Sequence, residues 1–139
     1  MRAAGFTLLE LVGTLGLAAV LGGTSVTRLV TLVEGARLAG GVRTVATTLR
    51  VARGRALADG RQIEVRFDQI RRACETRDAD GRTLETAPLP RGVVFAGLPA
   101  RARILFGALG VAENGTITLG AGARQRSVVV NQRGRVRLA

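Results

Sequence analysis

The most constraining feature of this sequence is an apolar run that follows a single acidic residue near the N-terminus. Glu10 is followed by residues 11–27, none of which carries a charge, and the next charged residue is Arg28. As a helix this run would be about 26 Å long at about 1.5 Å per residue, close to the roughly 30 Å hydrocarbon core of a bilayer. We therefore predict a membrane-embedded helix over residues 6–33.

The order of the segments around this run predicts that the helix stays on the mature protein. A secretory signal places its apolar region first and a small-residue cleavage site after it. Here the only evident processing point, Gly5, precedes the apolar run. We expect residues 1–5 to be a leader peptide, and residues 6–139 to be the mature chain with its hydrophobic helix retained.

Residues 34–58 continue as a helix of amphipathic character. Their apolar residues recur at alternating steps of four and three, which places them on one helical face. These residues are Leu38, Val42, Val45, Leu49, Ala52 and Ala56. Gly40-Gly41 and Gly54 weaken a helix by up to about 1 kcal/mol each relative to alanine, so we expect a continuous helix that can bend. Asp59-Gly60 predicts its end, with Gly60 available for a left-handed cap.

The pattern then changes to period two, which is typical of half-buried strands. In residues 62–68, Ile63, Val65 and Phe67 alternate with charged residues. Further short strands are predicted at 83–86, 93–96, 103–106, 116–119, 126–130 and 135–138, with turns at 78–81, 114–115, 120–122 and 131–134. The predicted fold class is α+β, with an antiparallel β-sheet over residues 62–139 packed on the helix over residues 34–58, together forming a soluble domain over residues 34–139.

Composition adds a strong basic excess to this architecture. The chain has 21 basic and 10 acidic residues, and every basic residue is arginine. Such a charge favours polyanions or acidic membrane surfaces as partners, although charge kept only for solubility is an open alternative. From Pro88 onward eight arginines stand against a single acidic residue, Glu113, so the excess is concentrated toward the C-terminus.

The same composition argues against catalysis. The sequence has no histidine or lysine and a single cysteine, Cys74, and serine occurs only at Ser25 and Ser127. No nucleophile has an evident base, and soft-metal sites need several Cys or His ligands. We therefore predict neither an enzyme nor a cofactor or metal site, and expect Cys74 to be a structural thiol.

The segment Gly5-Phe6-Thr7-Leu8-Leu9-Glu10 closely resembles the prepilin cleavage motif of type IV pilins and type II secretion pseudopilins. The resemblance implies that a prepilin peptidase cleaves after Gly5 and N-methylates Phe6. It also implies that Glu10, the fifth mature residue, pairs with the N-terminal amine of a neighbouring subunit. A carboxylate in an apolar helix needs such a partner. The alternative is that Glu10 only marks the membrane interface.

The C-terminal part is similar to the H-type minor pseudopilins, the GspH/FimT group. The similarity is carried by Ile104–Phe106, Gly115–Leu119, Ser127–Asn131 and the ending Gly134–Arg137. It implies a type IV pilin fold and a minor subunit near the tip of a type IV pilus or type II pseudopilus. Its partners would be other pilin or pseudopilin subunits. The chain would cross the inner membrane once, with its C-terminal domain periplasmic, and enter a filament on assembly.

The FimT-like branch includes minor pilins that bind DNA in natural transformation through a GRxR motif. Gly134-Arg135-Val136-Arg137 fits that motif. In a strand Arg135 and Arg137 would share one face about 6.7 Å apart, with Val136 and Leu138 turned to the core. This implies contacts to the phosphate backbone of double-stranded DNA. Further arginines would widen the patch: Arg124, Arg126 and Arg133.

Three functions stay open at this point. The first is a DNA-capturing minor pilin. The second is a GspH-like type II secretion pseudopilin that primes the filament for protein secretion without binding DNA. The third is a monotopic membrane protein outside any filament.

Overall fold

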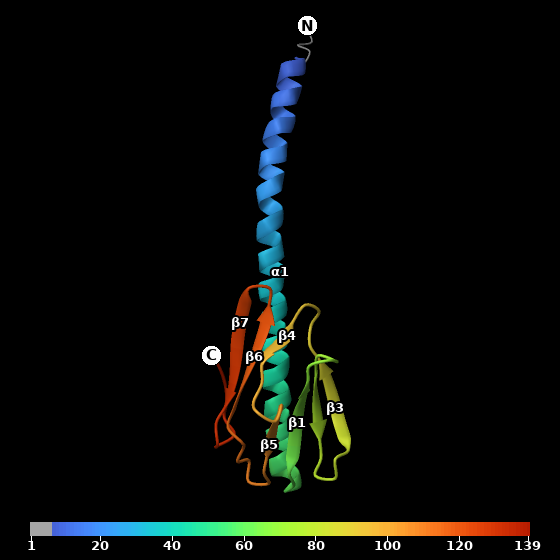
Figure 1. The fold of residues 1–139 in the computed structure, drawn as a ribbon, viewed down its shortest axis with the longest axis vertical. Coiled ribbons are helices and arrows are strands. Elements are labelled where there is room, and N and C mark those ends of the chain that lie inside the picture. The colour runs from blue at the N-terminus through green and yellow to red at the C-terminus, as the bar shows by residue number, and fades with distance from the viewer. Residues whose placement is uncertain (1–6) are drawn as a thin grey trace. The chain divides into compact units, whose positions relative to one another are not determined.

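In the part of the chain that the structure describes, a single helix is followed by eight short strands (Figure 1). This computed structural model describes residues 7–139, except for the side chains of residues 20–28. The predicted processing site, Gly5 and Phe6, lies outside the described residues. The elements are α1 (Leu8–Asp59), β1 (Ile63–Asp68), β2 (Ala73–Arg77), β3 (Thr83–Pro88), β4 (Val94–Gly97), β5 (Arg103–Phe106), β6 (Gly115–Ala121), β7 (Arg124–Val130) and β8 (Val136–Leu138).

Helix α1 begins and ends at residues whose chemistry explains both boundaries. At its start the hydroxyl of Thr7 accepts the backbone N–H of Glu10 at 3.3 Å, as an N-cap residue does. At its end Asp59 is followed by Gly60 with φ +60°, the left-handed conformation that glycine adopts without strain. The predicted end of the helix at Asp59-Gly60 is therefore confirmed, and α1 runs without interruption for 52 residues.

The contacts within the chain define two compact units, Met1–Val33 and Glu34–Ala139. The described apolar side chains of the first unit are exposed, as at Leu8 and Leu9. Among the residues that the structure describes, no helix combines the length and apolarity needed to cross a membrane. Every buried hydrophobic residue of the described chain belongs to the second unit, so residues 34–139 have a complete hydrophobic core of their own.

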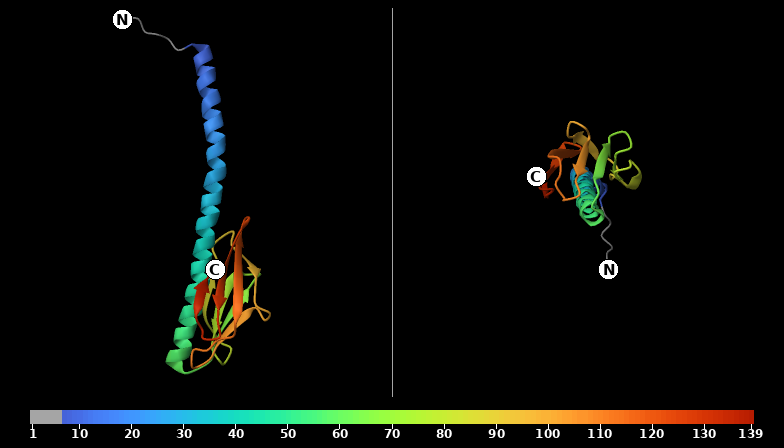
Figure 2. Two further views of the ribbon diagram at one scale, coloured as in Figure 1. Left: turned by 90° about the vertical axis from the view of Figure 1, so that its left-hand side faces the viewer. Right: turned by 90° about the horizontal axis from the view of Figure 1, so that it is seen from below.

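The strands form two antiparallel sheets rather than the single sheet predicted. Their orders are β3-β2-β1-β5 and β4-β6-β7-β8, and the strands cover one side of the C-terminal part of α1 (Figure 2). Side chains of the two sheets pack against each other. Phe67 of β1 and Phe95 of β4, for example, meet edge to face with ring centroids 5.7 Å apart. Sequence alternation identifies strands but says nothing of which strands pair, which is why the division was missed.

Strand β2 was not predicted. Its sequence, Ala-Cys-Glu-Thr-Arg, lacks a run of β-branched or aromatic residues. Pairing of Phe67 with Cys74 and Val65 with Thr76 turns the thiol and hydroxyl toward the core. On the other face Glu75 is held by Arg77 at 2.7 Å. The strand is held by pairing with β1 and β3 on its two sides, not by its intrinsic propensity.

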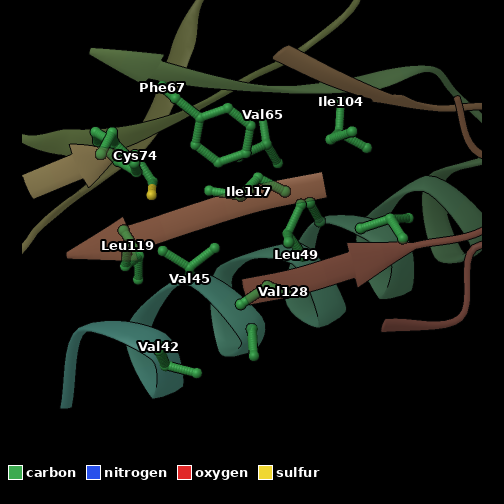
Figure 3. Close-up of a cluster of buried hydrophobic side chains, with 14 of the residues drawn as sticks. Val42, Val45, Leu49, Val65, Phe67, Cys74, Ile104, Ile117, Leu119 and Val128 are labelled. Atoms are coloured by element: carbon green, nitrogen blue, oxygen red, sulfur yellow. The ribbon is translucent and has the colours of Figure 1, made fainter. Parts of the chain in front are cut away.

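The core forms where α1 meets both sheets (Figure 3). All six helical residues predicted for the buried face are at most 3% exposed, and they pack with residues such as Val65, Ile117 and Val128. Gly41 has a packing role: a Cβ there would lie 2.9 Å from Cγ1 of Val93. The glycine pair thus lets the segment after β3 approach the helix closely.

Burial raises the pKa of the Cys74 thiol to about 12, so the thiol stays protonated at neutral pH. We expect the native thiol to react with an alkylating reagent at pH 8 on the order of a thousandfold more slowly than an unfolded cysteine, since the thiolate is the nucleophile. Mass spectrometry of the alkylated protein, with and without guanidinium chloride, measures this difference. Equal rates in both states would contradict the buried position of Cys74.

Candidate functional site

The hairpin of β7 and β8 places Arg137 on the sheet face that points away from α1. Val129 pairs with Arg137 and Val130 with Val136, and directly paired residues share a face. Since Val130 is buried against α1, Arg137 belongs to the opposite face. Arg135 precedes β8 and is not one of its paired residues. It lines one depression together with Arg137 and another together with residues of α1, so a shared strand face for Arg135 and Arg137 stays a prediction.

Arg124 and Arg126 lie on the other face of the same sheet. Arg126 pairs with Leu119 and Arg124 with Ala121, and both partners are buried on the side of α1. The guanidinium of Arg124 reaches Gly35 of α1, with Nη1 2.7 Å from where a Cβ of that glycine would be. The structure does not bring these two arginines together with Arg135 and Arg137.

Strand β8 is only partly covered, because it is the last strand of its sheet. Val136 packs against the core, as predicted. Leu138 pairs with the buried Val128 and so lies on the side of α1, as predicted. It is nevertheless 58% exposed, so it is not a core residue. An edge strand loses the neighbours that would cover its far end.

The turn before β8 is held by its own polar groups and by α1. Asn131 Oδ1 accepts the N–H of Arg135 at 2.9 Å, and the Gly134 N–H donates to the Asn131 carbonyl at 2.8 Å. Gly134 has φ +69°, and a Cβ there would collide with the carbonyl oxygen of Gly110 and lie 2.8 Å from Nε of Arg53. That Nε donates to the same Gly110 carbonyl at 3.3 Å. The glycine of the motif thus fixes the turn against the helix.

Three adjoining depressions surround this turn. Asn114 and Gln132 line both the first and the second, and Arg135 lines both the second and the third. We call the joined depressions the arginine trough, after the arginines that line them: Arg50, Arg53, Arg101, Arg103, Arg133, Arg135 and Arg137. Glu113 is the only acidic residue among the described residues that line the trough.

Most arginines of the trough are free to bind a ligand. Arg103 forms an ion pair with Glu64, with Nη1 3.6 Å from Oε2. Arg53 donates a hydrogen bond from Nε to the Gly110 carbonyl. The other five are exposed and, within the described chain, have no acidic partner within 4.0 Å: Arg50, Arg101, Arg133, Arg135 and Arg137. Unpaired guanidiniums at such a site bind phosphate oxygens, with two parallel hydrogen bonds each in the best geometry.

Sequence reasoning found three arginines of the trough and missed four. Arg101 and Arg103 lie in the basic C-terminal half. The charge excess there indicated a basic surface but did not show which arginines form it. Arg50 and Arg53 lie on α1, far away along the chain, and only the packing of β8 against the helix brings them to Arg135.

Glu10 occupies the third position of α1, counted from Leu8. With Thr7 it forms the sequence pattern of a capping box, Thr-x-x-Glu, and the hydroxyl of Thr7 accepts the Glu10 N–H. Its negative charge also suits the positive end of the helix dipole. Glu10 therefore has a local role at the start of the helix, in addition to its predicted role in assembly. Sequence reasoning did not consider the local role.

The fold, a long N-terminal helix packed on antiparallel strands, is that of the type IV pilin-like proteins. The minor pilin FimU of Pseudomonas aeruginosa superposes with a TM-score of 0.65 at 18% identity, over 78% of this chain and 92% of that chain. The minor pseudopilin EpsH of the Vibrio cholerae type 2 secretion system superposes with a TM-score of 0.56 at 18% identity, over 70% and 92%. At these identities the likeness shows the fold.

The family follows from the sequence itself. The family model described as type II transport protein GspH matches residues 41–134. The chain belongs to this family, as the resemblance of its C-terminal strands predicted, and its class is that of the minor pilins and pseudopilins. A comparison with curated protein sequences gave no match.

Proposed function

We propose that this minor pilin-like subunit binds double-stranded DNA through the arginine trough, in a filament that captures DNA for uptake. The observation that carries the proposal is the set of five unpaired, exposed arginines in three neighbouring depressions that share lining residues. Aromatic platforms for base stacking are scarce, with only four phenylalanines in the chain. Contacts would be made to phosphates, so affinity falls steeply with salt and depends little on sequence.

The same proposal places the subunit in the inner membrane before assembly. A prepilin peptidase cleaves after Gly5 and methylates Phe6, residues 6–33 hold the chain in the bilayer as a single pass, and residues 34–139 are periplasmic. The exposed apolar side chains of the first unit, such as Leu11 and Leu15, support this. In the filament, near its tip, Glu10 pairs with the N-terminal amine of a neighbouring subunit.

DNA binding is tested with residues 34–139 by fluorescence anisotropy on a labelled duplex. We expect Arg135→Gln with Arg137→Gln to lower affinity at least tenfold. The slope of log affinity against log salt should fall in magnitude by about 2, since each phosphate contact contributes about 0.9. The matched control is Arg43→Gln with Arg82→Gln, which removes the same charge from exposed positions outside the trough.

A second function is favoured by the family description, type II transport protein GspH. In that case the subunit primes a secretion pseudopilus for protein export without binding DNA. Unchanged DNA affinity in the Arg135→Gln, Arg137→Gln protein, or binding that ignores added salt, would reject the trough and leave this function.

A further inference from the structure

The arginines that the trough leaves out form a second basic surface. Arg124 lies at the end of residues 34–139 where the chain of α1 enters that unit, because its guanidinium lies against Gly35. The turn between β6 and β7 and the segment after β3 both reach this end of the unit, beside α1 (Figure 1, Figure 2). We call the arginines there the arginine collar: Arg37, Arg91 and Arg124.

One side of the collar is built by the β6–β7 turn. Gly122, with φ +56°, lies against the carboxylate of Glu34, whose Oε2 is 2.5 Å from the position of a Cβ. Two residues on, the guanidinium of Arg124 lies over Gly35, which has no side chain to displace it. The glycines thus let the turn and its arginine lie close to the helix.

The other side is built by the turn of residues 90–93. The Val93 N–H donates to the Pro90 carbonyl at 3.1 Å, and the Pro90 ring lies 3.6 Å from where a Cβ of Gly40 would be. This turn presents Arg91 at its apex. Arg37 extends from α1 to the same turn, with Nη1 3.8 Å from the Cβ position of Gly92.

The charge of the collar is uncompensated. All three arginines are exposed, and within the described chain none has an ion-pair partner. Glu34 is the only acidic residue in the three segments that meet here, 34–46, 90–97 and 120–127. An exposed and unpaired set of guanidiniums is suited to a surface of phosphates.

We propose that the arginine collar binds the anionic phospholipid headgroups of the bilayer, and so seats the domain on the membrane surface before it enters a filament. The proposal rests on the proposed function only in that residues 6–33 are held in the membrane, which keeps this end of residues 34–139 near the headgroups. A basic residue close to an anionic surface strengthens binding by about fivefold at physiological salt. An anionic bilayer is favoured over DNA as the ligand because the collar lies beside residues 35–40, the first turns of the domain after the predicted membrane segment.

The test uses residues 34–139 and vesicle sedimentation. Vesicles of phosphatidylcholine alone are compared with vesicles of equal parts phosphatidylcholine and phosphatidylglycerol. We expect binding to the anionic vesicles only, and a loss on the order of a hundredfold in Arg37→Gln, Arg91→Gln, Arg124→Gln. Arg37→Gln with Arg91→Gln, which leaves Arg124 packed on Gly35, should lose about thirtyfold. Thermal melting verifies that each protein is folded.

The matched control removes three charges from the trough: Arg50→Gln, Arg135→Gln, Arg137→Gln. This protein should keep its vesicle binding and lose DNA binding, and the collar protein should do the reverse. Equal losses of vesicle binding in both proteins, or equal binding to neutral vesicles, would overturn the collar. Loss of DNA binding in the collar protein alone would assign the collar to DNA and overturn both proposals. Unchanged DNA binding in both proteins, with the expected vesicle results, would reject only the trough.

Discussion

Replacing Gly134 with alanine is expected to destabilise residues 34–139 by about 2–5 kcal/mol. A left-handed conformation costs a residue with a Cβ roughly 1–2 kcal/mol, and overpacking adds about 1–3 kcal/mol. Here the Cβ would meet the backbone oxygen of Gly110 and the Nε of Arg53, and the backbone oxygen cannot move aside as a flexible side chain does. Urea denaturation followed by circular dichroism measures the change in unfolding free energy.

Gly81 provides the matched control for this prediction. It also has a positive φ, +81°, but no atom lies within 4 Å of where its Cβ would be. Gly81→Ala therefore measures the conformational cost alone, about 1–2 kcal/mol. If Gly134→Ala were no more destabilising than Gly81→Ala, the packing of the β7–β8 turn on Gly110 and Arg53 would be wrong. DNA affinity should also fall in Gly134→Ala, because the same turn positions Arg135 and Arg133.

Glu10→Gln in the full chain is expected to abolish incorporation into filaments, with a loss of more than about tenfold, while the protein stays in the membrane. The proposed partner of Glu10 is a positively charged amine, and an uncharged amide in an apolar environment lacks the ionic attraction. Glutamine still satisfies the capping box, so the start of α1 is kept. Immunoblotting of sheared filaments against the membrane fraction measures the distribution.

Thr7→Ala tests the capping role of Glu10 separately from its role in assembly. It removes the hydroxyl that accepts the Glu10 N–H, at about 1 kcal/mol of helix stability, but leaves the carboxylate. Its incorporation should be close to normal. Normal incorporation of Glu10→Gln, or equal losses in both proteins, would show that the charge of Glu10 is not the assembly determinant and that the cap suffices as its role.

The helix and several strands were predictable because their signals are local. The steps of four and three from Leu38 to Ala56 define a face of one helix without reference to any other element. The alternation of Ile63, Val65 and Phe67 likewise defines a strand face. In both cases the structure buries the predicted residues, since a periodic apolar face must find cover wherever the chain folds.

Other features depended on neighbours and were not predictable. Strand β2 is polar in sequence and is stabilised by the strands on either side of it. Leu138 reads as a core residue but lies at a sheet edge. The separation into two sheets likewise depends on which strands pair, and pairing is set by packing between segments far apart in the chain.

The same distinction between local sequence signals and tertiary packing applies to the arginines. The sequence by itself determined that residues 88–139 are strongly basic and that Arg135 and Arg137 are two positions apart, the spacing that places residues of one strand on the same face. Only the tertiary structure decided that Arg124 and Arg126 face the other way, and that Arg50, Arg53 and Arg101 join the trough. The register of β7 on β6 and the packing of the β7–β8 turn on α1 set those positions, and neither is written in the local pattern of any one segment.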